Sequence, residues 1–134
     1  MMQPRNRKHK KEFRGKMRGI AWRGSTITFG EFGLQATDRG WISAKQIEAA
    51  RKTVARATKR RGRIWIKMFP HKPVTKKSDE VTRGAGKGEV DHYVCVIKPG
   101  LVLLEIGGLD KEVSVSSLKL AAQKLPIKTR VIEK

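Results

Sequence analysis

The sequence predicts one α+β domain, in which a mostly antiparallel sheet packs with two helices, preceded by a basic N-terminal extension. Short β-branched and aromatic runs follow one another with turn residues between them, rather than alternating regularly with helices. Two longer segments instead place apolar residues at helical spacing. A chain of 134 residues with 38% apolar content suits a single domain with a modest core. We expect an arm at residues 1–23 and the α+β domain at residues 24–134.

The arm at residues 1–23 has no sustained apolar period, and Gly15 and Gly19 interrupt its charges. We expect it to be disordered in the free protein and to fold only against a partner. An arginine-rich, acid-poor start also fits an organellar transit peptide, so that interpretation stays open at this point. Apart from the acid Glu12, the arm is strongly basic and contains Arg5, Arg7, Lys8, Lys10, Lys11, Arg14, Lys16, Arg18 and Arg23.

Three strands are expected in the first half of the domain, at residues 25–29, 32–37 and 64–69. Each is a run of β-branched and aromatic residues, and in the third the residues alternate between two faces. Gly30 separates the first two runs, a turn sequence follows at residues 37–40, and Pro70 ends the third strand.

A helix is expected at residues 44–61. Ser43 is a good N-cap, Gln46 completes a capping box, and Gly62 suits the left-handed position after the last turn. A narrow apolar stripe of Ile47, Ala50, Val54 and Ala57 predicts close packing on a sheet. The other side of the helix carries a cluster of cations without interleaved acids after Glu48, which favours phosphate contact over a merely solvated face: Lys45, Lys52, Arg56 and Lys59.

The second half of the domain is expected to contain a hairpin, in which strands at residues 90–97 and 101–106 flank Lys98-Pro99-Gly100. Asp110 can cap a second helix. The remaining expected elements are a short strand at residues 74–76, a polar glycine-rich loop at 78–89, the helix at 111–125 and a closing strand at 127–132.

No catalytic or metal-binding pattern is present. The glycine loop at residues 84–88 lacks the Ser or Thr after Lys87 and the following helix that a nucleotide phosphate loop requires. Cys95 is the only cysteine and lies in an apolar run, where a buried thiol is expected. The histidines are scattered and suggest no zinc site: His9, His71 and His92. We therefore expect no enzyme activity, no cofactor and no metal.

Among the aromatic residues, Trp22 is the best candidate for stacking on a base, because it lies in a basic segment without a helix or strand pattern. Trp65 and three phenylalanines lie inside strand patterns and are expected in the core: Phe29, Phe32 and Phe69.

The formal charge of +19 makes a polyanion the expected partner, because phosphates neutralise such self-repulsion. No apolar run approaches the length of a membrane span. Three interpretations follow: a ribosomal RNA-binding protein, an architectural RNA- or DNA-binding protein outside the ribosome, and a small RNA-modifying enzyme or nuclease. The last requires a catalytic cluster, and the second would be favoured by a symmetric dimer, for which no interface helix is visible.

Four long motifs, in the same order, resemble the family of bacterial-type large-subunit ribosomal protein L16. They are TFGEFGLQA (residues 28–36), QIEAARKTVARATKRRGRIWIKMFPHKPVTKK (46–77), GAGKGEVDHYVCVIKPG (84–100) and KLAAQKLPIKT (119–129). The opening MQPRNRKHKKEFRGKMRG is similar to the family's own N-terminus, which argues against a transit peptide. The resemblance covers essentially the whole chain.

The resemblance implies a structural, non-enzymatic protein of the large ribosomal subunit with an α+β fold. Its expected partners are the large-subunit rRNA beside the aminoacyl-tRNA site (A site), the A-site tRNA, and neighbouring ribosomal proteins. Contact with peptidyl-site (P-site) tRNA stays open. The protein would join late in assembly, without membrane or homo-oligomer contacts, in the cytoplasm or, if encoded by an organelle, in its matrix or stroma.

By family position, the basic residues of the arm and of the predicted helix face would contact rRNA. The loop at residues 82–88 would point toward the tRNA, with Thr82, Arg83, Gly84, Gly86, Lys87 and Gly88 as its expected site residues. Thr82 stands where the family often has an arginine, which is hydroxylated in some members, so this modification is not expected here unless Arg83 substitutes.

Overall fold

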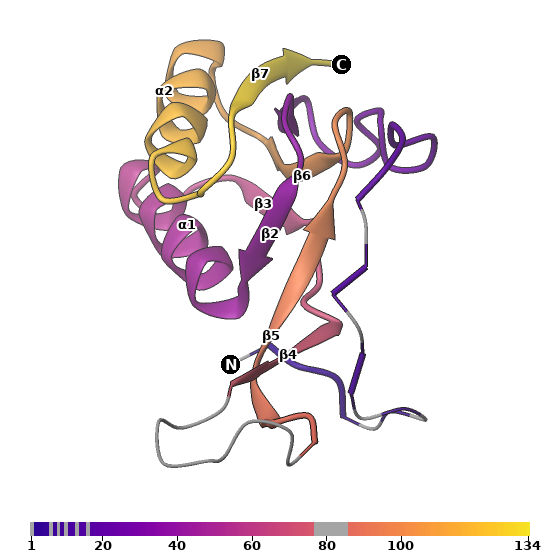
Figure 1. Ribbon diagram of the computed structural model, residues 1–134. Helices are drawn as coiled ribbons and strands as arrows, with labels where there is room; N and C mark the ends of the chain where they lie inside the picture. The colour runs from indigo at the N-terminus through magenta and orange to yellow at the C-terminus, as the bar shows by residue number, and fades with distance from the viewer. Residues whose placement is uncertain are drawn as a thin grey trace.

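The computed structural model describes residues 2–5, 7, 9, 11–12, 14–15, 17–76 and 86–134, and it has the predicted α+β fold (Figure 1). Within these residues the elements, in chain order, are β1 (Phe32–Ala36), β2 (Gly40–Ser43), α1 (Ala44–Ala57), β3 (Arg63–Ile66), β4 (Lys72–Lys76), β5 (Glu89–Ile97), β6 (Val102–Gly107), α2 (Lys111–Ala122) and β7 (Thr129–Glu133).

The described strands form two antiparallel sheets. One sheet has four strands in the order β3-β6-β1-β7, and the other has three in the order β2-β5-β4. The helices α1 and α2 lie side by side (Figure 1). They cover the face of the four-stranded sheet to which Leu34, Leu104 and Ile106 contribute, and these side chains are buried with Ile47 and Val54 of α1 and Leu118 of α2. Burial of each such side chain stabilises the fold by about 1.5–3 kcal/mol.

The predicted capping box begins α1. The Ser43 hydroxyl accepts from the Gln46 amide N–H at 3.3 Å, and the Gln46 side-chain oxygen accepts from the Ser43 N–H at 2.9 Å. The helix ends at Ala57, however, four residues earlier than expected. The amide and the hydroxyl of Thr58 both donate to the Val54 carbonyl, and Lys59 and Arg60 turn into left-handed backbone conformations with φ of 55° and 61°.

This early end of α1 is needed to bring the chain onto the sheet. A Cβ at Gly62 would lie 2.6 Å from the Gly107 carbonyl oxygen, so the backbones of β3 and β6 approach closely there. The strand β3 then begins at Arg63, which lies opposite Gly107. A helix extended to residue 61 would leave no residues to turn the chain into this register.

The predicted hairpin is wrong. The strands β5 and β6 lie where they were expected, but they belong to different sheets: β5 pairs with β2 and β4, and β6 pairs with β1 and β3. The turn between them binds the end of β1, because the Gly100 N–H donates to the Ala36 carbonyl and the Ala36 N–H donates to the Leu101 carbonyl. β1 therefore takes the position beside β6 that a hairpin partner would occupy.

The predicted strand at residues 25–29 is also absent among the described residues. There the N–H groups of Thr28, Phe29 and Gly30 donate to one carboxylate oxygen of Glu105, at 3.1, 2.7 and 2.8 Å. Three successive amides that converge on one atom cannot also make the alternating bonds of a sheet. The sequence did not predict the short strand β2, because residues 37–40 have the composition of a turn and Ser43 is a helix N-cap.

The remaining elements differ from prediction only at their ends. The helix α2 stops at Ala122 rather than residue 125, and Asp110 adopts the N-cap conformation without a side-chain cap bond. β3 stops at Ile66, β4 extends back to Lys72, and β7 covers Thr129–Glu133. Of the predicted loop at 78–89, residues 78–85 lie outside the described residues.

Glu105 holds a buried charge whose environment favours ionisation. Burial alone would raise the pKa of the carboxyl, but the three N–H donors and the positive charge of Lys67 outweigh burial and lower the pKa. The Lys67 ammonium lies 3.5 Å from Oε2, the oxygen that accepts no hydrogen bond.

We expect Glu105→Gln to reduce the free energy of unfolding at neutral pH by about 2 kcal/mol, because a neutral amide replaces a carboxylate that accepts three N–H bonds. The folded pKa is below the unfolded one, so the stabilisation is complete above the unfolded pKa and is lost as pH falls through the folded pKa. Urea unfolding from pH 7 to pH 3 should therefore show the wild type losing stability faster than the variant. The exposed control Glu31→Gln should stay within about 0.5 kcal/mol of wild type at neutral pH; an equal loss in both variants would contradict the special role of Glu105.

Candidate nucleic-acid interface

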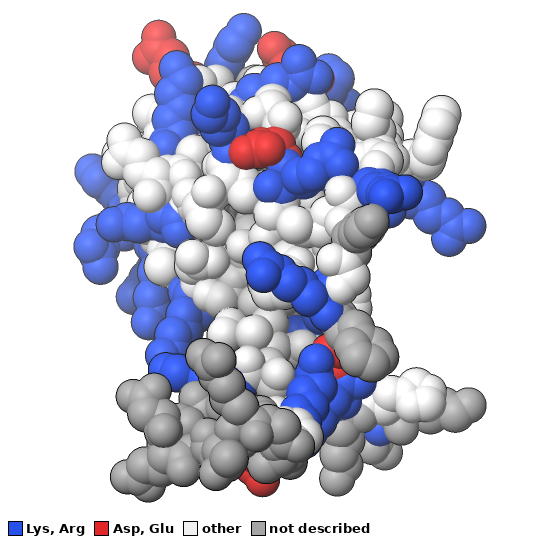
Figure 2. Space-filling model, viewed as in Figure 1, with Lys and Arg blue, Asp and Glu red and all other residues white. Residues whose placement is uncertain are grey.

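The predicted basic face of α1 is exposed to solvent. Lys52 and Arg56 line a shallow concavity of about 690 Å3, together with Arg51, Ala55, Lys59 and Arg60. Figure 2 shows lysine and arginine side chains gathered along the edge where α1 lies in Figure 1. None of the residues that line this concavity is acidic. The helical spacing therefore places three of the four predicted cations together: Lys52, Arg56 and Lys59.

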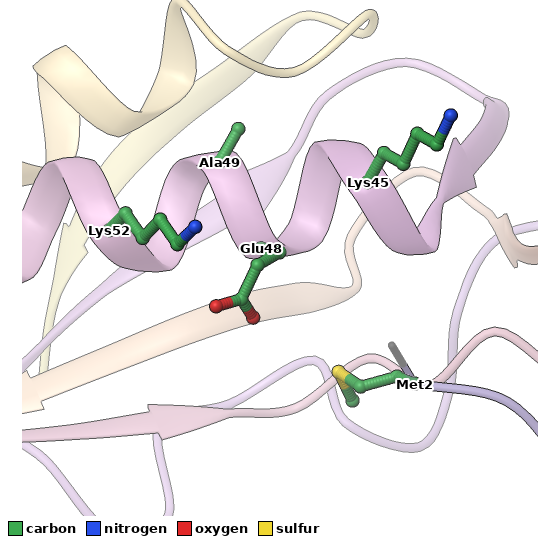
Figure 3. A pocket seen from close by; sticks show the side chains of 5 residues that line it. All are labelled: Met2, Lys45, Glu48, Ala49 and Lys52. Atoms are coloured by element: carbon green, nitrogen blue, oxygen red, sulfur yellow. The ribbon is translucent and has the colours of Figure 1, made fainter.

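The fourth predicted cation, Lys45, lies nearer the start of α1. It lines a second concavity with Lys52, Glu48 and Ala49, and Met2 of the arm faces it from the other side (Figure 3). Met2 is partly buried against the core. The beginning of the arm therefore lies at the same helix face as the predicted cations.

Two further cations belong to this surface, although the sequence did not indicate them. Arg51 is three residues after Glu48 on the helix, and the two side chains pair at 2.5 Å. Their hydrogen bond lowers the pKa of Glu48 and raises the pKa of Arg51. Arg60 is exposed and lines the concavity from the left-handed turn that follows Thr58.

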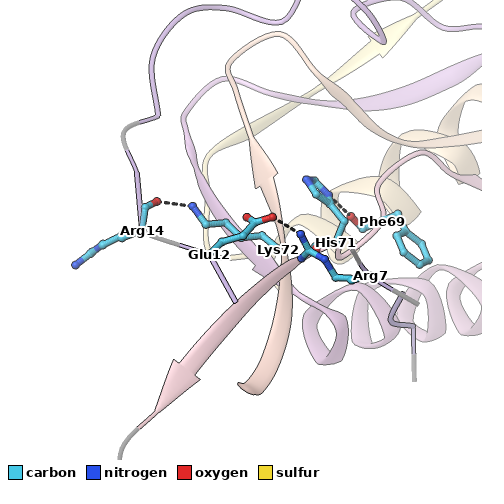
Figure 4. Close-up of polar contacts among 6 residues, drawn as sticks. All are labelled: Arg7, Glu12, Arg14, Phe69, His71 and Lys72. Carbon is cyan, nitrogen blue, oxygen red and sulfur yellow. Dashed lines mark hydrogen bonds and ion pairs between the residues drawn. The ribbon is translucent and has the colours of Figure 1, made fainter. Parts of the chain in front are cut away.

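Part of the arm lies along β4. Arg7 donates to the His71 carbonyl and pairs with Glu12, and Lys72 donates to the Arg14 carbonyl (Figure 4). The guanidinium of Arg14 lies 5.7 Å, and the ammonium of Lys72 5.0 Å, from the ring centre of Trp41. Two predicted arm cations are thus held against the domain.

The other predicted arm residues divide into two groups. Arg5, Lys11, Arg18 and Arg23 are exposed, whereas Lys8, Lys10 and Lys16 lie outside the described residues. The Lys11 ammonium donates to the Lys87 carbonyl at 3.2 Å, across 76 positions of sequence. This contact brings the arm to the predicted tRNA-proximal loop. Of that loop the structure describes Gly86, Lys87 and Gly88, while Thr82, Arg83 and Gly84 lie outside the described residues.

Three aromatic side chains are exposed in the part of the chain that the structure describes. Trp22, the predicted stacking candidate, is 94% exposed. Phe29 and Phe69 are 59% and 47% exposed, so the prediction that they belong to the core is wrong, whereas Phe32 is buried as expected. Phe29 lies outside the core because its bond to Glu105 holds its segment over β6, on the face of the sheet away from the helices.

The described residues contain no group of three or more His, Cys, Asp or Glu side chains placed to hold a metal. Cys95 is buried, and burial raises the pKa of its thiol, which suits a packing residue rather than a nucleophile. No helix among the described residues is long and apolar enough to span a membrane.

An α+β domain with a cationic helix face, a basic arm and exposed aromatic rings has the features of an RNA-binding protein. Compared with known protein families, residues 4–132 match the family described as Ribosomal protein L16p/L10e. The chain belongs to this family, as its motifs indicated. It is accordingly a structural, RNA-binding protein of the large ribosomal subunit that serves in translation, and the family is not one of enzymes.

Proposed function

We propose that the protein binds large-subunit rRNA beside the aminoacyl-tRNA site through its arm and its α1 face, and that its loop at residues 82–88 contacts A-site tRNA. The same placement of the loop would also allow it to contact P-site tRNA. The observation that carries this proposal is the bond between Lys11 and Lys87, because it joins the proposed rRNA-binding arm to the proposed tRNA-facing loop. Late entry into the assembling subunit and contacts with neighbouring ribosomal proteins belong to the same proposal.

The α1 face suits an rRNA backbone. Its concavity gathers five long cations, of which only Arg51 forms an ion pair at contact distance among the described residues. Phosphates are spaced closely enough along RNA for several such cations to engage at once, with release of bound counterions. Recognition is then of backbone and shape rather than of base edges.

The arm suits a partner that is already folded. We propose that it is disordered before assembly and that phosphate contacts made by residues such as Arg5, Arg18 and Arg23 offset its ordering cost. Arg7 and Arg14 have a different task here, because their contacts with β4 and Trp41 hold the arm in place.

The loop suits close approach to a nucleic-acid backbone. Gly86 has φ of 96°, and a Cβ built there would meet no atom within 4 Å, so this part of the loop borders open space. Lys87 adds an exposed cation at the same place.

Co-sedimentation of the tagged chain with ribosomal particles, at low salt and after a high-salt wash, tests the proposal. Retention in the large-subunit peak through the wash is expected. A spread over all nucleic acid, or release to the top of the gradient, would instead favour an architectural RNA- or DNA-binding protein outside the ribosome.

We expect the double variant Lys52→Glu, Arg56→Glu to bind large-subunit particles at least tenfold more weakly in 0.1 M salt and to elute from them at lower salt, because two phosphate contacts become repulsive. The matched control Lys119→Glu, Lys124→Glu makes the same charge change at exposed positions on or just after α2. Titration of particles that lack the protein, with bound chain measured after pelleting, gives both affinities. Equal losses in the two variants would show that only net charge matters and would reject α1 as a specific rRNA surface.

We expect Lys87→Glu to leave incorporation into the large subunit unchanged and to weaken A-site tRNA binding about fivefold, because an acid replaces a cation at the tRNA-facing loop. Filter binding of aminoacyl-tRNA to reconstituted ribosomes measures this effect. Lys98→Glu, an exposed cation just beyond the other end of β5, is the control and should leave tRNA binding at the wild-type level. Wild-type tRNA affinity in the Lys87 variant would contradict the assignment of this loop.

A further inference from the structure

We propose that Phe29, backed by Trp65, is a stacking site for one unpaired nucleobase of the large-subunit rRNA, on the side of the four-stranded sheet away from the helices. This inference rests on the proposed function only in taking rRNA as the partner. We call the pair the Phe29 platform.

The platform is a pair of nearly parallel rings. The ring centres of Phe29 and Trp65 lie 6.1 Å apart, and the ring planes differ by 19°, which is a stacked arrangement. Trp65 is half-buried and packs over the backbone of β6, since a Cβ at Gly107 would lie 3.2 Å from the Trp65 ring. Phe29 is the exposed member, so the pair presents an aromatic surface that is supported from within.

The backbone that carries Phe29 is fixed. Its N–H donates to Glu105 Oε1 at 2.7 Å, and its two neighbours, Thr28 and Gly30, donate to the same oxygen. A Cβ at Gly30 would lie 2.6 Å from the Ile106 carbonyl oxygen, so only glycine lets the segment lie this close to β6. A ring held on such a support loses little conformational entropy when a base stacks on it.

Two cations lie beside the platform, and one of them, Lys67, also pairs with the buried Glu105. The Lys67 ammonium lies 4.6 Å from the centre of the Phe29 ring, and Lys134 donates to the Thr28 carbonyl at 3.5 Å. Arg63, Trp65 and Lys67 lie at every second position, so in and just beyond β3 they share one face. The opposite face carries Ile64 and Ile66, which pack against the core under the helices.

This setting favours a nucleobase over a protein side chain. An aromatic ring flanked by lysine or arginine is what RNA-binding sheets offer to an unpaired base and its phosphates. The long side chains beside Trp65 on this face are cationic rather than apolar, so they do not extend an apolar patch of the kind that a protein partner would cover. The nearest acid along the chain, Glu31, is turned toward the Gly108 N–H at 3.4 Å.

Ultraviolet cross-linking at 254 nm, in large subunits reconstituted with the full chain, tests the inference directly. We expect a nucleotide adduct on Phe29, identified by mass spectrometry of the digested particle. Subunits that incorporate the chain and yield nucleotide adducts elsewhere on it, but none on Phe29, would overturn the platform while leaving the proposed function intact. A peptide from another protein joined at Phe29 would also overturn it. A wild-type chain that does not enter large subunits would reject both.

Substitutions separate stacking from folding. We expect Phe29→Leu to bind particles lacking the protein about tenfold more weakly, the loss expected for one stacked base. Phe29→Trp should stay within about twofold of wild type, because it restores an aromatic face. Phe69→Leu is the matched control, since Phe69 is also exposed but stacks on no other ring in the described part of the chain. Equal binding by the two leucine variants, or loss of binding by both Phe29 variants, would overturn the platform.

Discussion

One buried carboxylate determines how the outer side of the four-stranded sheet is built. Glu105 lies within β6, and a charge there is costly unless it is paired and fully hydrogen-bonded. Three successive amides bond one of its oxygens, and the Lys67 ammonium pairs with the other at 3.5 Å. Because those amides belong to neighbouring residues, the carboxylate also dictates the path of residues 28–30 over β6. The same interaction therefore stabilises the sheet, exposes Phe29 and places Lys67 beside the Phe29 ring.

Charge is distributed so that the acids neutralise cations locally and leave whole surfaces basic. Glu48 neutralises Arg51 at the side of the α1 face, and Glu12 neutralises Arg7 where the arm meets β4. Glu105 neutralises Lys67 beneath the Phe29 platform. The excess of +19 is carried by the remaining cations. Self-repulsion of this size is relieved when rRNA supplies phosphates, so the full stability of the chain belongs to the assembled subunit.

Sequence reasoning succeeded where the physical cause is local. Ser43 and Gln46 lie three residues apart, so their capping box could be predicted, and helical spacing alone brought Lys52 and Arg56 together. It failed where the partner is remote. Glu105 is 75 or more residues from the amides it binds, and β1 inserts beside β6 where Pro99 and Gly100 suggested a simple hairpin. The exposure of Phe29 and the position of Arg60 follow from backbone paths that residue types do not encode locally.

The arm contacts both the α1 face and the loop at residues 82–88, the two surfaces that the proposed function assigns to RNA. Met2 faces α1 beside Lys45, Arg14 lies over Trp41 beside β4, and Lys11 bonds to the backbone of Lys87. If rRNA orders the arm, it also fixes one anchor of the loop that we propose contacts tRNA, because the Lys11 bond exists only when the arm lies along the domain. Because the arm is then already ordered at the rRNA surface, less conformational entropy is lost when the loop binds. In the proposed function, a chain of this size can thereby couple its place in the subunit to a contact with tRNA without any change in its folded core.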